Sequence, residues 1–161
     1  MDKPKIGLLK AQVTHLIPTV VYKTLFNKKI YIYGNDYKTP DGTCIRDYVH
    51  IKDICSVIKK SIIFLKKKNN SEIFNIGNRV GISNKSVVDC VKKITKKKIK
   101  LEYAKRREGD IAKTICNSGK AKRKLLWQSK NSNLNDIVRD EINWIKEFNK
   151  MGLKRTFKSY K

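Results

Sequence analysis

Arginines beside turn residues are the side chains in this sequence best suited to binding a ligand. Arg46 follows a glycine-containing turn, and the neighbours Arg106 and Arg107 precede Gly109. A guanidinium group is planar and can bind a phosphate through two parallel hydrogen bonds, so arginines on separate loops suit a diphosphate. Composition alone favours the alternative, in which these arginines form surface ion pairs with nearby carboxylates: Asp47, Glu108 and Asp110.

The residue patterns of several other site classes are missing. The two histidines are His15 and His50, and spacing assigns no serine or cysteine nucleophile a histidine and carboxylate partner. The four cysteines lie far apart, without the paired spacing of a zinc site, so we expect no metal and mostly buried, reduced thiols. Gly77 and Gly81 match neither the dinucleotide nor the Walker glycine pattern, and we expect a turn with positive φ there.

The formal net charge is +24, from 38 lysines and arginines against 14 aspartates and glutamates. Such an excess raises the question of a nucleic-acid partner. Lysine dominates, however, and no RNP, zinc-finger or helix-turn-helix pattern accompanies it. The lysine runs 66–68 and 96–98 fall where helices are expected to end, as the helix dipole favours. We therefore expect solvated lysine faces; attraction of an anionic substrate and, less favoured, nucleic-acid binding stay open as alternatives.

Alternating strand and helix patterns place the chain in the mixed α/β classes. Amphipathic spacing predicts helices at 14–26, 53–68, 83–94, 120–125 and 133–148. We expect helix caps at Thr14, Ser83 and Asn133. Runs of β-branched and aromatic residues predict strands at 30–33, 44–50, 72–76, 99–103 and 114–116. These strands are too few and too short for a full doubly wound sheet.

A length of 161 residues with 40% hydrophobic content fits one domain. We expect that domain at 1–150, followed by a basic, frayed tail at 151–161. No apolar run approaches the roughly 20 residues of a membrane span, and residues 1–5 do not lead into the apolar core of a secretory signal. We therefore expect a cytoplasmic protein without a membrane partner.

One long segment resembles a known enzyme family. Residues 33–53, YGNDYKTPDGTCIRDYVHIKD, are similar to the long motif of UDP-galactose 4-epimerases, in the extended short-chain dehydrogenase family. Four further stretches agree in order: 14–18, 74–78, 106–110 and 125–127. The resemblance covers about residues 12–149, which is nearly the whole chain.

This resemblance implies that one part of the chain contacts the sugar and base of a nucleotide sugar. His15 and Leu16 would lie where family members contact the nucleotide sugar, often with asparagine in the place of His15. Tyr31 and Tyr33 would border the uracil. A flat apolar wall of this kind is what a nucleobase requires.

The resemblance also implies a site for the diphosphate and the ribose. Arg46 and Arg107 would clamp the diphosphate, Tyr48 would support that site, and Asp110 would accept hydrogen bonds from the ribose. Two cationic forks and a hydroxyl acceptor match the chemistry of a UDP-sugar. We therefore expect Arg46 and Arg107 to converge on one cavity.

The cofactor-binding elements of complete family members are not recognised here. Those members begin with a Rossmann half that carries a glycine-rich fingerprint, and they use a Tyr-x-x-x-Lys pair with NAD. We therefore assign no catalytic residue, and we expect NAD in the complete enzyme but not on this chain alone. The expected fold is a small mixed α/β substrate-binding domain, the C-terminal portion of an extended short-chain dehydrogenase without its Rossmann half.

The predicted function follows from the family resemblance and from the missing cofactor-binding elements. We expect part of a truncated or split UDP-glucose/UDP-galactose 4-epimerase, which binds the UDP-sugar during NAD-dependent 4-epimerisation in galactose metabolism. The alternative is a noncatalytic binding or structural remnant that pairs with a separate cofactor-binding half. Whether the sugar carries an N-acetyl group stays open. Without that half, apolar surface on Leu16, Val20 or Ile137 would be exposed, and a homodimer could form.

Overall fold

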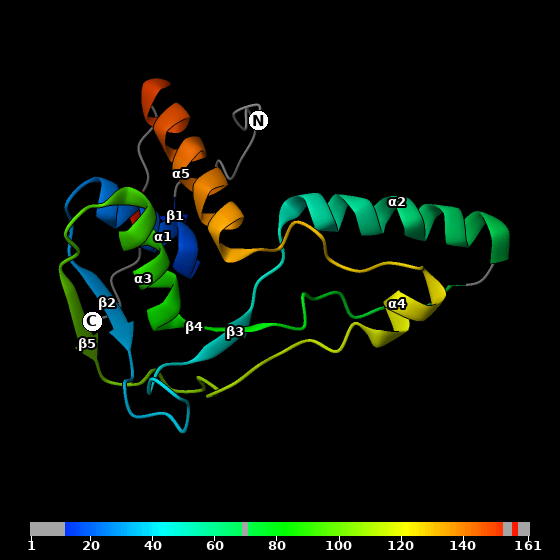
Figure 1. Cartoon of the computed structure of the whole chain (residues 1–161), viewed down its shortest axis with the longest axis horizontal. Helices are drawn as coiled ribbons and strands as arrows, with labels where there is room; N and C mark the ends of the chain where they lie inside the picture. The colour runs from blue at the N-terminus through cyan, green and yellow to red at the C-terminus, as the bar shows by residue number, and fades with distance from the viewer. Residues whose placement is uncertain (1–11, 69–70, 153–155, 158–161) are drawn as a thin grey trace.

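The computed structural model describes residues 12–68, 71–152 and 156–157 (Figure 1). Helices and strands alternate along these residues. Their bounds are β1 (Gln12–Val13), α1 (Leu16–Leu25), β2 (Ile30–Tyr33), β3 (Ile45–Asp47), α2 (Ile51–Lys68), β4 (Gly81–Ser83), α3 (Asn84–Thr95), β5 (Leu101–Ala104), α4 (Gly119–Lys124), α5 (Leu134–Lys150) and β6 (Thr156–Phe157).

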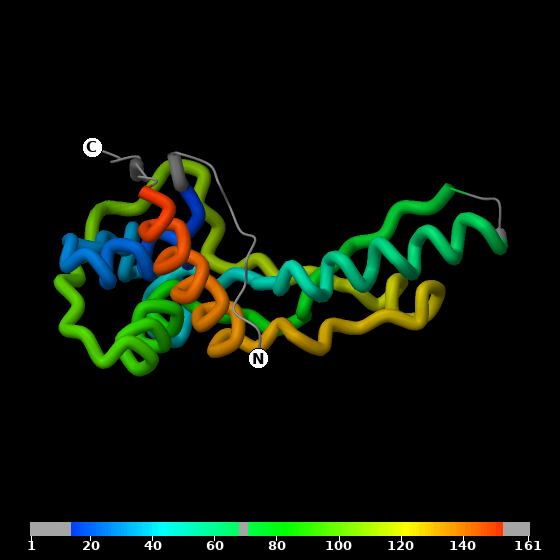
Figure 2. The backbone as a smooth tube through the Cα atoms, turned by 90° about the horizontal axis from the view of Figure 1, so that it is seen from above, coloured from blue at the N-terminus to red at the C-terminus, as the bar shows by residue number. Residues whose placement is uncertain are grey.

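The described residues form two lobes, a body and an arm. The arm comprises residues 51–68, 71–76 and 118–131, and therefore contains α2 and α4. The body contains the other elements. Two views at right angles show the arm extending away from the helices of the body (Figures 1 and 2).

The strands pair two by two, and the described residues contain no larger sheet. β2 and β5 are parallel, with Ile30 opposite Leu101, and β1 and β6 are also parallel. β3 and β4 are antiparallel, with Ile45 opposite Ser83. A mixed α/β fold with too few strands for a doubly wound sheet is therefore confirmed.

The main core lies between three helices and β2. α1 packs against both α3 and α5, and α3 packs against α5. The side chains that meet there recur at helical spacing, or at alternate positions of β2: Val20, Val21, Ile30, Ile32, Val87, Val91, Val138, Ile142 and Ile145. Burying these apolar groups is the main stabilising contribution to the body, and it fixes the positions of α1 and β2.

The predicted helix caps are confirmed at two of three positions. Ser83, the cap of α3, accepts a hydrogen bond from the amide of Ser86. Asn133, the cap of α5, accepts one from the amide of Asn135. The cap at Thr14 is wrong, because α1 begins at Leu16 and its cap position holds a histidine without a side-chain cap bond.

Three predicted strands are shortened or missing. The segment 44–50 contributes only Ile45–Asp47, and 114–116 forms no strand beside the isolated bridge between Ile45 and Lys113. Residues 72–76 alternate between half-buried and exposed side chains, as in a strand, but they have no ladder partner among the described residues. A strand requires a neighbouring edge, and the pattern of one segment does not supply it.

Gly77 and Gly81, which follow the arm in the chain, do not have the positive φ that was predicted for them. Positive φ occurs instead at Arg79, with φ 63°. A Cβ atom at Gly77 would collide with Cys116 and with the carboxylate of Asp47. That carboxylate accepts hydrogen bonds from the amides of Arg79, at 3.0 Å, and Cys116, at 3.1 Å. Gly77 is therefore required for close packing.

The arm has a small core of its own. Trp127 is 2% exposed, and its indole Nε1 donates a hydrogen bond of 2.7 Å to Ser56 Oγ on α2. The other residues of this core come from α2, from α4 and its C-cap, and from the segment 71–76: Val57, Phe64, Phe74, Ile76, Ala121 and Leu125. One face of α2 is thereby covered.

The exposed apolar surface lies elsewhere than predicted. Val20 is fully buried, and Leu16 and Ile137 are half-buried in the body, so the expectation of exposed apolar surface there is wrong. The structure exposes the uncovered face of α2 instead. Its apolar residues follow the helical period and define the α2 stripe: Ile51, Cys55, Ile58, Ile62 and Leu65.

The predicted tail at 151–161 is described in part. Thr156–Phe157 form β6 beside β1, whereas residues 153–155 and 158–161 lie outside the described part of the chain. Across the ranges that are described, no helix has the length and apolar character to cross a lipid bilayer.

Candidate functional site

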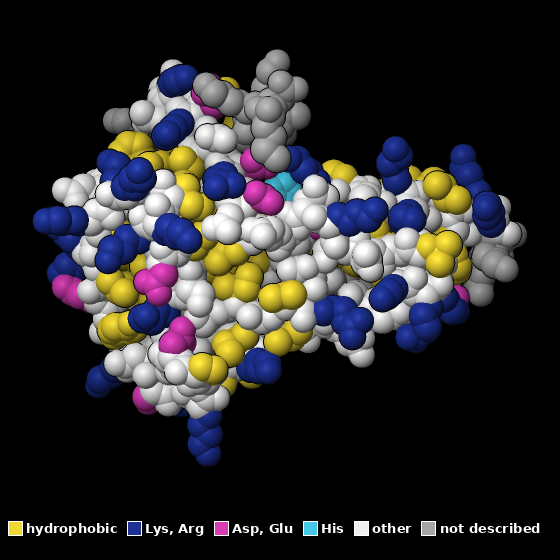
Figure 3. Space-filling view, in the orientation of Figure 1, with side chains coloured by type: hydrophobic (Ala, Val, Ile, Leu, Met, Phe, Trp, Pro, Cys, Tyr) yellow, Lys and Arg dark blue, Asp and Glu magenta, His cyan; other side chains and the backbone are white. Residues whose placement is uncertain are grey.

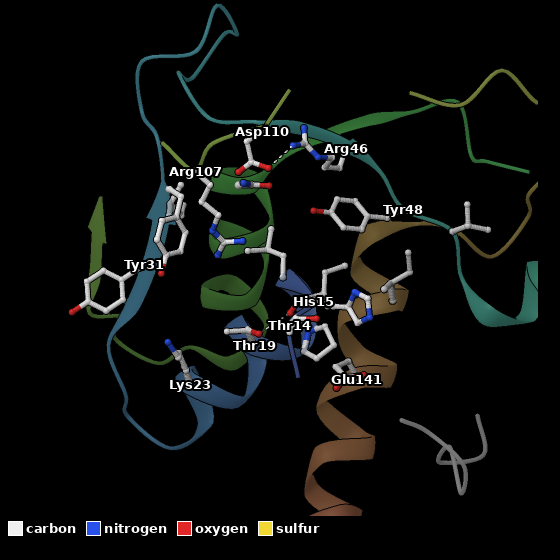
Figure 4. A pocket seen from close by; sticks show the side chains of 18 residues that line it. Thr14, His15, Thr19, Lys23, Tyr31, Arg46, Tyr48, Arg107, Asp110 and Glu141 are labelled. Carbon is white, nitrogen blue, oxygen red and sulfur yellow. Dashed lines mark hydrogen bonds and ion pairs between the residues drawn. The ribbon is translucent and has the colours of Figure 1, made fainter. Parts of the chain in front are cut away.

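A cavity of about 530 Å³ lies in the body beside α1, β2 and β3 (Figure 4). Its volume is within the roughly 300–1,000 Å³ usual for small-ligand pockets. All eight residues predicted to bind a nucleotide sugar line it: His15, Leu16, Tyr31, Tyr33, Arg46, Tyr48, Arg107 and Asp110. The fold therefore brings together residues from distant segments of the chain.

Arg46 is held in place by backbone carbonyls. It extends from β3, and its Nη1 donates hydrogen bonds to the carbonyl oxygens of Ile45, at 3.0 Å, and Ile111, at 2.6 Å. Its Nη2 lies 3.4 Å from Asp110 Oδ1, and about a third of each of these two side chains is exposed. The guanidinium is thus oriented before any ligand binds, with a carboxylate at its side.

Arg107 approaches the same cavity from the segment after β5. Its guanidinium carbon lies 3.9 Å from the centre of the Tyr33 ring, which is a cation–π distance. Arg106 differs, because its Nε is 2.7 Å from Asp36 Oδ1 and its guanidinium lies over the Tyr37 ring. Arg106 does not line the cavity and forms a surface ion pair, although its partner is Asp36 and not the expected Asp47, Glu108 or Asp110.

The period of β2 places two tyrosines on the cavity side. Ile30 and Ile32 are each 1% exposed and point into the core, so the alternate residues Tyr31 and Tyr33 point the other way. Tyr31 is 40% exposed, while Tyr33 is half-buried beneath Arg107. The two rings give the cavity an aromatic wall, which Arg107 partly covers at Tyr33.

Tyr48 lines the cavity as a neutral phenol. Burial raises its pKa to about 12, against a smaller lowering by the charge of Arg46. The spacing Tyr-x-x-x-Lys, which the sequence was expected to lack, does occur at Tyr48 and Lys52. It is unsuited to proton transfer, because a general base needs a pKa near the working pH and Lys52 Nζ is instead 3.3 Å from Asp140.

His15 and Leu16 reach the cavity from the first turn of α1. His15 is exposed at the cap position, and the Oγ1 atom of Thr19 donates a hydrogen bond of 2.7 Å to its carbonyl oxygen. Sequence reasoning missed two charged residues of the lining, Lys23 and Glu141. Helical spacing could have identified Lys23, which lies two turns after Leu16 on the same side of α1.

His50 has a structural environment outside this cavity. Its Nδ1 accepts a hydrogen bond from the amide of Lys52, at 3.0 Å, so a neutral ring carries its proton on Nε2. Nε2 lies 3.1 Å from Asp140 Oδ2, and the ring is 5% exposed. The histidine therefore links the start of α2 to α5.

The thiols are only partly as predicted. Within the described ranges all four are free, but Cys44 alone is buried, Cys90 and Cys116 are half-buried, and Cys55 is exposed. The same ranges contain no group of three histidine, cysteine or acidic side chains placed to hold a metal ion.

Sequence comparison gives the chain a broad set of relatives. The family model described as GDP-mannose 4,6 dehydratase matches residues 7–140. UDP-glucose 4-epimerase of Halalkalibacterium halodurans is 38% identical over 144 residues, which are 89% of this chain and 43% of that protein. UDP-glucose 4-epimerase of Mycoplasma genitalium is 36% identical over 148 residues, with 88% and 42% covered. The chain thus spans less than half the length of these relatives.

Structural comparison gives the same result. The epimerase of Stenotrophomonas maltophila, solved with NAD and formylated UDP-arabinopyranose, superposes with a TM-score of 0.84 at 27% identity, over 89% of this chain and 43% of that one. The epimerase of Thermotoga maritima, solved with UDP-glucose, gives a TM-score of 0.71 at 26% identity, over 83% and 40%. The described residues therefore have the fold of part of such an enzyme.

Proposed function

The chain belongs to the family described as GDP-mannose 4,6 dehydratase, and we propose that its cavity binds a UDP-sugar as part of a UDP-glucose/UDP-galactose 4-epimerase. The observation that carries this proposal is the convergence of Arg46 and Arg107 on one cavity, beside an aromatic wall. The two guanidinium groups supply forks for a diphosphate, which neutral side chains would not.

The remaining lining residues take the other parts of the ligand. Tyr31 and Tyr33 border the base, and Asp110 accepts hydrogen bonds from the ribose hydroxyls. His15 and Leu16 contact the nucleotide sugar from the start of α1. Tyr48 supports Arg46 as a neutral phenol, because burial keeps its pKa at about 12. A neutral phenol does not take the place of the ligand's phosphate as the anionic partner of Arg46.

The glycine loop at 77–81 does not fit the phosphates of the dinucleotide cofactor of such an enzyme. A phosphate cradle needs glycines that leave space and backbone amides that point to the anion. Around Gly77 the space is taken by Cys116, and the amide of Arg79 is already bound to the Asp47 carboxylate. We therefore derive no step through NAD, and the role proposed for this chain is binding and orientation of the nucleotide sugar.

Calorimetric titration with UDP tests the diphosphate clamp. We expect Arg46→Ala/Arg107→Ala to weaken UDP binding by about a hundredfold, because two charge-assisted contacts are lost. Arg106→Ala is the matched control and should bind like the wild type, since that arginine pairs with Asp36 outside the cavity. Equal affinity of the double variant and the wild type would remove the clamp; Arg107→Ala alone serves if the double variant does not fold.

A second candidate role is pairing with the portion of the family fold that has no counterpart here. The α2 stripe favours it: Ile51, Ile58, Ile62 and Leu65 are 67%, 53%, 49% and 47% exposed along one line of the helix. An apolar line of this length is typical of a surface covered by another polypeptide. Cys55 lies within the stripe, so slower alkylation of its thiol when a partner is bound tests this role.

A further inference from the structure

Lys23 is a cation of the cavity lining that the proposed clamp does not use. It extends from α1 on the opposite side of the lining from Arg46 and Asp110, next to Tyr31 (Figure 4). Its Nζ lies 5.7 Å from the centre of the Tyr31 ring. The ammonium therefore stands at the edge of the aromatic wall, away from the Arg46 guanidinium.

Lys23 is half-buried, and no described carboxylate forms an ion pair with its ammonium. Burial lowers the pKa of this lysine, and the charge of Lys28 lowers it further. Both effects show that the charge is incompletely stabilised in the free protein. A ligand oxygen that accepts its hydrogen bonds would offset that cost.

We infer that Lys23 selects the nucleobase, by donating a hydrogen bond to a ring carbonyl oxygen of a base that stacks beside Tyr31. This inference rests on the proposed binding of a nucleoside diphosphate. Uracil carries two carbonyl oxygens at its edge, whereas adenine has none, so the contact favours uracil over adenine. A phosphate is a less suitable acceptor, because Lys23 and Arg46 lie on opposite sides of the lining.

Titration with UDP and ADP tests the inference, because these ligands share the diphosphate and the ribose and differ in the base. We expect the wild type to prefer UDP by about tenfold, the effect of one charge-assisted hydrogen bond. Lys23→Met should lose that preference by weakening UDP binding while ADP binding stays unchanged. Lys28→Met is the matched control, since Lys28 lies over the Tyr22 ring and does not line the cavity.

The other outcomes are equally informative. If Lys23→Met weakens UDP and ADP by the same factor, Lys23 contacts phosphate and the inference is overturned. It is also overturned if the wild type binds UDP and ADP equally, or if Lys23→Met binds UDP like the wild type. If the wild type binds neither nucleotide, the proposed function itself fails, which is a result distinct from those three.

Discussion

The half-buried phenol of Tyr48 makes the stability of the folded chain fall at alkaline pH. Its pKa is about 12 in the folded state, against about 10 for an unfolded tyrosine, so the folded state holds the proton more tightly. This stabilisation is complete below about pH 10 and is lost as pH rises toward 12. It amounts to about 2–3 kcal/mol, the free energy of a shift of about two units.

The variant Tyr48→Phe should remove this dependence. Between pH 9 and pH 12, we expect the free energy of unfolding, measured with urea, to fall by about 2–3 kcal/mol more in the wild type than in Tyr48→Phe. Tyr31→Phe is the control, because Tyr31 is 40% exposed, and it should follow the wild type. Parallel curves for all three proteins would contradict the assignment.

Arg106 and Arg107 show how far the sequence determines the site at the scale of residues. The motif identified the arginine pair, and Arg107 does line the cavity, as the motif implied. Composition could not separate the two neighbours, because their difference depends on Asp36, which is distant in sequence and pairs with Arg106 alone. Lys23 was missed for another reason: it lies on α1 beyond the stretch 14–18 that carried the resemblance.

At the scale of elements, Asp53 joins the start of α2 to the segment before α5. Its carboxylate is 1% exposed and accepts hydrogen bonds from Ser132 Oγ, at 2.6 Å, from the amide of Asn131, at 2.9 Å, and from that of Lys130, at 3.1 Å. Burial would raise the pKa of this carboxyl, but the hydrogen bonds from Ser132 and Asn131 outweigh it and lower the pKa.

Replacing this carboxylate should loosen the arm. We expect Asp53→Ala to lower the free energy of unfolding at pH 7 by about 2–4 kcal/mol, because the buried hydroxyl of Ser132 and the part-buried donors of residues 130–131 lose their acceptor. The lowered pKa means that this stabilisation is present above about pH 4 and is lost as pH falls further, so the variant should be less sensitive to acid. Asp89→Ala, at an exposed helix pair with Lys85, should change stability by less than about 0.5 kcal/mol; a similar loss in both variants would contradict the role of Asp53.

Elements with their own periodicity were predicted well, whereas strands were predicted unevenly. The strand at 30–33 matches β2, but 44–50 is shortened and 72–76 and 114–116 form no strand. The helices near 16–25, 84–95 and 134–150 follow from apolar spacing, and two caps follow from residue type. The segment 72–76 has the alternation of a strand, yet no described strand pairs with it. The sequence of this segment favours an extended strand, but a strand pairs only when another segment offers a sheet edge.

At the scale of the whole molecule, the excess positive charge is dispersed. Lysine and arginine side chains lie over both the body and the arm, and they form no single continuous band on the face seen in Figure 3. Several are neutralised locally, as where Lys120 and Lys124 both bind Glu72. This arrangement favours solvated lysine faces over a dedicated nucleic-acid groove, which would gather cations along one track. The net charge of +24 also opposes the close approach of two copies.

The arm leaves the α2 stripe uncovered, and this exposed face predicts where a second polypeptide would bind. The portion of the H. halodurans relative outside its match to this chain is the partner to test, because the chain spans 43% of that protein. We expect that portion to slow alkylation of Cys55 by at least about tenfold, since the thiol would be buried on binding. Ile58→Lys/Ile62→Lys should abolish the protection by placing charges in an apolar contact.

Cys90 provides an internal reference for the same experiment. It lies on α3 in the body, where its Sγ is 3.3 Å from Asn135 Oδ1, and its alkylation rate should not change when the arm is covered. Equal slowing of both thiols would indicate nonspecific association. Protection of Cys55 that rises with the concentration of this chain alone would identify a second copy as the occupant, despite the charge repulsion. Unchanged reactivity of Cys55 at saturating partner would show that the α2 stripe is not the contact surface.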